Sequence, residues 1–247
     1  MITVKGDHNF TLRGTVGFAI GGLLVVPLFI AFRSLDELLP GDWFRLLTET
    51  VPLACAPGFG GWWLMRDKTR QFRSGLGLGL ADENPEQGRN TSALATALAF
   101  FIPALLVSTT IAFSDDLYYG QPEELKKYIR IALRILVVIE MALMGGIGSY
   151  AVARVAGMRK PITLQGARAF AGSGILMFAL NDLYAAVEHA FQSDQTVETD
   201  IDFGPAPLSE LIILLAILSF ALTIPLSLAG FWLGRLLDQA AGENVSQ

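Results

Sequence analysis

The chain has 247 residues, of which 52% are hydrophobic and only 17% are charged, and its mean hydropathy is +0.48. A soluble domain carries about 25% charged residues, so this composition excludes an ordinary soluble domain and favours an integral membrane protein. The formal net charge is −5, which argues against nucleic acid as a partner.

Six apolar segments are predicted to cross the bilayer, since a transmembrane helix needs about 17–25 mostly apolar residues. They cover roughly residues 15–33, 49–66, 92–113, 130–154, 168–190 and 209–235. We therefore predict an all-α integral membrane protein in which residues 1–247 form a single polytopic membrane domain. The first segment is long for a signal peptide and no small-residue cleavage site follows it, so we expect it to be retained.

Arginines flank these segments in a pattern that occurs three times. They open a segment at Arg13, Arg89 and Arg168, and they close one at Arg66, Arg154 and Arg235. The pattern predicts three helical hairpins, at about residues 13–66, 89–154 and 168–235.

The closing segments of the three hairpins also resemble one another. In residues 58–66, 146–154 and 227–235, small residues are followed by an aromatic residue four positions before the arginine. This similarity indicates an internal triplication. The competing interpretation is general: membrane helices place small residues at packing faces, and aromatic residues and arginine at the interface.

The basic residues are divided unequally between the two ends of the predicted hairpins. Twelve of the 18 lie on the side that holds both termini. An excess of lysine and arginine marks the cytoplasmic side of a membrane protein. We therefore predict cytoplasmic termini and a multi-pass protein of the cell inner (plasma) membrane.

The second segment contains an unusual group of helix-perturbing residues: Pro52, Pro57, Gly58, Gly60 and Gly61. Proline removes a backbone donor and clashes with the preceding turn, so we expect a kink or break near Pro57. Broken helices line transport sites in many membrane proteins. The alternative is a kinked helix whose glycines permit close packing.

Two carboxylates interrupt apolar segments and are candidates for function, because ionisable residues inside a membrane are costly. Glu140 lies fourteen residues before Arg154, and Asp182 lies fourteen residues after Arg168. At about 1.5 Å per residue, both carboxylates lie about 21 Å from these arginines. Consecutive helices joined by a short turn pack antiparallel, so both carboxylates would lie at one depth on neighbouring helices.

Glu140 and Asp182, together with Asn181, could therefore form a cation or proton site. Two other interpretations remain open. Asp182 or Glu188 could instead form a structural ion pair with Arg134, or the charged groups could extend toward the membrane interface.

No other chemistry is predicted. The chain has only two histidines, His8 and His189, which argues against paired-histidine haem ligation and against an all-histidine metal centre. We expect no metal, no cofactor and no catalytic activity. The leading hypothesis is a transporter- or channel-like protein that moves a cation or a proton-coupled solute. The alternative is a non-catalytic integral subunit that packs against a larger membrane complex. The expected partners are the lipid bilayer and either further copies of the chain or other membrane subunits.

Overall fold

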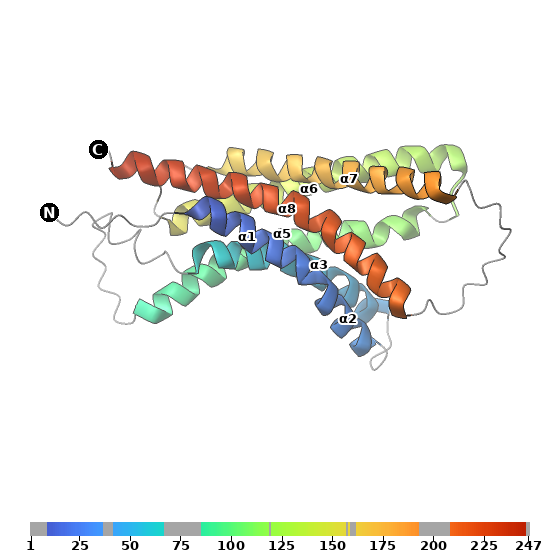
Figure 1. Cartoon of the computed structure of the whole chain (residues 1–247), viewed down its shortest axis with the longest axis horizontal. Helices are drawn as coiled ribbons and strands as arrows, with labels where there is room; N and C mark the ends of the chain where they lie inside the picture. Colours follow the sequence, from blue (N-terminus) through green and yellow to red (C-terminus); the bar gives the residue numbers. More distant parts are fainter. Residues whose placement is uncertain are drawn as a thin grey trace.

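The computed structural model describes residues 9–36, 42–66, 85–118, 120–156, 158, 162–192 and 208–245. Every element within these ranges is an α-helix, and together they form an elongated bundle (Figure 1). The helices are α1 (Phe10–Leu23), α2 (Val25–Asp36), α3 (Asp42–Met65), α5 (Pro85–Tyr118), α6 (Glu123–Val155), α7 (Thr163–Gln192) and α8 (Leu208–Val245).

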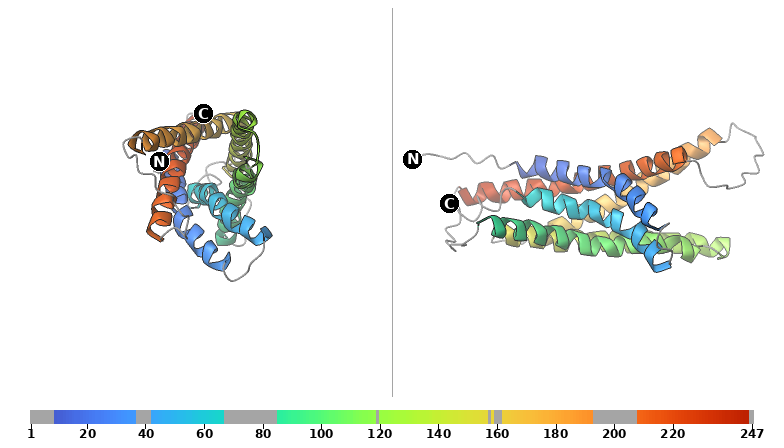
Figure 2. Two further views of the ribbon diagram at one scale, coloured as in Figure 1. Left: turned by 90° about the vertical axis from the view of Figure 1, so that its right-hand side faces the viewer. Right: turned by 90° about the horizontal axis from the view of Figure 1, so that it is seen from below.

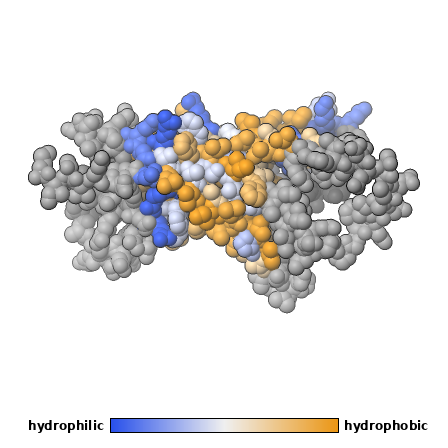
Figure 3. Space-filling view, in the orientation of Figure 1, coloured by the Kyte–Doolittle hydropathy of each residue, from blue (hydrophilic) through white to orange (hydrophobic). Residues whose placement is uncertain are grey.

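Four helical segments are long and apolar enough to cross a membrane: Phe10–Phe32, Ser92–Ser114, Glu124–Val155 and Ser219–Ala240. Large apolar side chains on these segments point outward, and Figure 3 shows an apolar region across the middle of the bundle, with hydrophilic residues at the end where α1 begins. The all-helical architecture predicted from the sequence is confirmed for the described residues, and a membrane location is consistent with it. α3 packs between α1 and α5, and α7 packs between α6 and α8.

The helices follow one another around a closed ring. Each helix packs against the next in the order α1, α3, α5, α6, α7 and α8, and α8 packs against α1 (Figure 2). The described chain therefore ends beside the helix with which it begins.

Small residues and one carboxylate close this ring between α1 and α8. Gly14 and Gly230 face each other so closely that a Cβ on either would overlap the backbone of the other. Small residues allow such close approach of two membrane helices. In the C-terminal part of α8, the Asp238 carboxylate accepts hydrogen bonds from the backbone N–H groups of Phe10 and Thr11, at 3.0 and 2.9 Å. It thereby satisfies backbone donors that the first turn of α1 cannot pair internally.

Three phenylalanines fill the interior of the ring. Phe18 of α1, Phe100 of α5 and Phe170 of α7 are fully buried, with ring centroids 5.4–5.5 Å apart. The phenylalanine side chains lie against glycines of neighbouring helices. A Cβ on Gly60 of α3 would come within 2.5 Å of Phe18, and a Cβ on Gly61 would come within 2.5 Å of Phe100. Glycine is required at these two positions because the aromatic rings occupy the space of a side chain.

Proline has different effects in α1–α2 and in α3. The first apolar segment is interrupted at Leu24, three residues before Pro27, which cannot donate a backbone hydrogen bond. In contrast, α3 runs without interruption through Pro52 and Pro57. The backbone of α3 is therefore not broken at Pro57, and a kink at that position stays a prediction.

Candidate functional site

Glu140 is the only carboxylate among the buried residues of the described chain. Its side chain is 5% exposed. One carboxylate oxygen, Oε1, accepts a hydrogen bond of 2.8 Å from the Thr110 hydroxyl of α5. The other oxygen, Oε2, is buried and has no hydrogen-bond partner among the described residues. Glu140 thus has one carboxylate oxygen that is buried without a hydrogen-bond donor from the described residues.

The sequence of α6 explains why this carboxylate is buried. Three buried apolar residues flank Glu140 on α6: Val137, Met141 and Met144. Val137 lies three residues before Glu140, and Met144 lies four residues after it. Residues at these spacings share one face of a helix. Glu140 therefore lies within the apolar face that α6 turns toward the bundle.

Asp182 has a different environment. The Arg134 guanidinium donates to both of its carboxylate oxygens, from Nη1 to Oδ2 at 2.8 Å and from Nη2 to Oδ1. Both side chains are partly exposed, at 32% for Arg134 and 53% for Asp182. The same guanidinium lies over the Phe178 ring, 5.4 Å from its centroid. The ion pair considered in the sequence analysis is therefore present in the structure.

A cavity of about 290 Å³ separates parts of α5, α6 and α7 near these groups. Thr110, Arg134 and Asn181 contribute to its wall, which also includes Tyr118 and Arg130. Thr110 therefore contacts the cavity and binds Glu140 at the same time. The polar wall of the cavity therefore includes Thr110, the residue that donates a hydrogen bond to the buried Glu140 carboxylate.

No protein-family model, curated protein or solved structure matches this chain. The functional assignment therefore depends on the geometry of the site.

The predicted residues of α3 lie elsewhere in the bundle. Pro52, Pro57, Gly58, Gly60 and Gly61 are all buried. The three glycines pack against aromatic residues of α1 and α5, as the close-packing interpretation expects. None of the five lines the cavity beside Thr110. A path lined by this helix stays a prediction.

The two predicted carboxylates thus bind different partners and do not form one shared site. Glu140 binds Thr110, whereas Asp182 binds Arg134, and Asn181 lies in the cavity wall. Sequence reasoning did not identify Thr110. Its signal was the run of three hydroxyls at 108–110 inside an otherwise apolar segment, but hydroxyls are common in membrane helices and usually bond to the preceding turn. No cluster of three metal-binding side chains occurs in the part of the chain that the structure describes.

Proposed function

We propose that this protein is a small transporter- or channel-like protein of the cell inner membrane, which moves a cation or a proton-coupled solute through a site at Glu140. One observation carries the proposal: a buried carboxylate whose second oxygen has no protein partner, bound to a hydroxyl that lines a cavity. A structural carboxylate would be expected to have both oxygens satisfied.

The chemistry follows from the cost of a charge inside a membrane. A carboxylate without a counterion in this environment is unfavourable, and binding a proton or a cation removes its net charge. In this proposal Thr110, which lines the cavity, links it to Glu140 through their hydrogen bond, and Asn181 supplies a polar side chain along the route. Asp182 neutralises Arg134 at the cavity wall, so that the guanidinium does not repel an approaching cation.

The proposal includes six membrane spans arranged as three related hairpins, with both termini in the cytoplasm. Two observations support the relationship between the hairpins. Phe18, Phe100 and Phe170 each come from the first helix of one hairpin. Gly60 and Gly148 occupy equivalent positions before their closing arginines, and each packs against the phenylalanine of its own hairpin.

Reconstitution into liposomes tests the site. We expect a flux of protons, Na⁺ or K⁺, measured with ion-sensitive dyes under an imposed gradient, that Glu140→Gln abolishes. Thr110→Val should lower the flux, because the carboxylate loses its hydrogen-bond donor. Glu124→Gln is the matched control, since Glu124 is exposed on the same helix and undergoes the same chemical change. Equal flux through the Glu140→Gln and Glu124→Gln variants would contradict the proposal.

The alternative, a non-catalytic membrane subunit, is favoured by a different observation. The three phenylalanines close the interior of the ring, so a route along its axis is blocked at their level. A subunit of this kind should lose stability when it is purified without its complex, because surfaces that evolved for protein contact meet detergent. Purification as a stable, monodisperse protein that also transports ions would exclude this alternative.

A further inference from the structure

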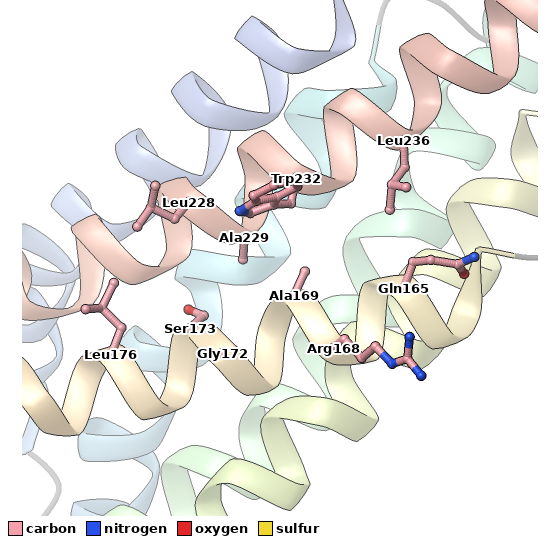
Figure 4. A pocket seen from close by; sticks show the side chains of 10 residues that line it. All are labelled: Gln165, Arg168, Ala169, Gly172, Ser173, Leu176, Leu228, Ala229, Trp232 and Leu236. Carbon is pink, nitrogen blue, oxygen red and sulfur yellow. The ribbon is translucent and has the colours of Figure 1, made fainter.

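A slot of about 500 Å³ lies between α7 and α8, on a different side of the ring from the cavity beside Thr110. Its wall is mainly apolar, with Leu176 and Leu228 at one end (Figure 4). Gln165 and Arg168 lie at the other end, beside the first turns of α7. The volume falls within the range of about 300–1,000 Å³ that is typical of ligand pockets.

Gly172 shows that this slot is an open space. A Cβ built on Gly172 meets no atom within 4 Å. In contrast, a Cβ on Gly145 or Gly174, at the neighbouring α6–α7 contact, would come within 3 Å of side chains or backbone of the facing helix. The α6 face of α7 is therefore tightly packed, whereas its α8 face leaves room for another molecule.

Ser173 supplies an unsatisfied polar group in the wall of the slot. Its side chain is 4% exposed, and its hydroxyl has no hydrogen-bond partner in the described part of the chain. Other hydroxyls in these helices, such as those of Thr15, Ser108 and Thr223, donate to the carbonyl four residues earlier. The Ser173 oxygen lies on the side of α7 that faces α8 (Figure 4). This hydroxyl is available to a molecule in the slot.

Each of the two helices that form the slot carries an arginine beside it. The Arg168 side chain is exposed there. Trp232 of α8 lines the slot, and the Arg235 guanidinium lies over its ring, 5.7 Å from the centroid. Two guanidinium groups on facing helices, next to an apolar slot, suit an anionic head group that is attached to a hydrocarbon chain.

We propose that the slot between α7 and α8 binds an anionic phospholipid, with its phosphate at Arg168 and Arg235 and one acyl chain between Leu176 and Leu228. Ser173 donates a hydrogen bond to an ester carbonyl of the lipid. The spacing along α7 fits this order of groups: at about 1.5 Å per residue, Ser173 lies about 7.5 Å and Leu176 about 12 Å beyond Arg168. The open side of Gly172 gives the acyl chain access to the helix backbone.

Native mass spectrometry and thermal unfolding in detergent test this proposal, with phosphatidylglycerol and phosphatidylcholine of identical acyl chains as probes. We expect phosphatidylglycerol to remain bound and to raise the midpoint of unfolding more than phosphatidylcholine does. Arg168→Gln should weaken phosphatidylglycerol binding by about fivefold, the contribution of one basic residue near an anionic lipid surface. Arg154→Gln is the control for charge, because Arg154 is an exposed arginine that closes α6 and does not line the slot.

Gly172→Leu is the decisive variant. The Cβ of the new side chain meets no atom within 4 Å, so we expect the leucine to occupy the slot and the protein to fold but to lose bound lipid. Circular dichroism confirms folding, and Ser173→Ala provides a second, smaller change that should weaken lipid retention. Equal binding of both lipids, unchanged retention in the Gly172→Leu variant, or an equal stabilisation by inorganic phosphate alone would each overturn the proposal.

Discussion

Replacing Phe100 by alanine tests whether the three buried rings hold the helices together. Phe100 is fully buried and lies 5.4 Å, between centroids, from both Phe18 and Phe170. Each aromatic pair contributes about 0.5–1.5 kcal/mol beyond simple burial. The neighbouring Gly61 and Gly148 have no side chains that could fill the space. We expect the free energy of unfolding to fall by about 3–5 kcal/mol, as for other Phe→Ala changes that leave a cavity.

Thermal unfolding in detergent micelles measures this effect. For a chain of about this length, 1 kcal/mol corresponds to about 2–4 °C, so the midpoint should fall by about 6–20 °C. Phe113→Ala is the matched control, because Phe113 lies on the same helix but is 44% exposed. Detergent or lipid can cover either side chain at that position, and we expect a change within about 0.5 kcal/mol. Equal destabilisation by the two variants would refute the packing argument.

Three further predictions concern the ring closure, the ion pair and the topology. Asp238→Ala removes the acceptor for three donors at the start of α1 and should cost about 1–2 kcal/mol in thermal unfolding, whereas Asp238→Asn should cost less. Asp182→Asn leaves Arg134 without its carboxylate; since both side chains are partly exposed, the loss should be about 1 kcal/mol, and an Arg134→Met change should restore most of it. Reporter fusions after Arg66 and Asp116 should report the cytoplasm and the opposite side, respectively, and the reverse result would contradict the proposed orientation.

The sequence alone predicted where the helices lie, because hydropathy and helix length respond to local composition. Predicted segments 92–113 and 130–154 lie inside α5 and α6. Both helices nevertheless extend beyond the predicted limits, to Tyr118 and from Glu123. Their outer turns carry charged residues, which lower the hydropathy without interrupting the backbone hydrogen bonds of a helix.

Interactions between helices depend on the rotation of each helix about its axis, which composition does not specify. The equal spacing of Glu140 and Asp182 from their arginines placed them at one depth. In the tertiary structure Glu140 points toward Thr110, whereas Asp182 points toward Arg134. The pairing of Asp238 with the start of α1 joins positions more than two hundred residues apart. Sequence patterns thus predicted an all-helical chain with segments apolar enough to cross a membrane. Packing in the closed ring decided which polar groups meet, because only packing fixes the direction in which each side chain points.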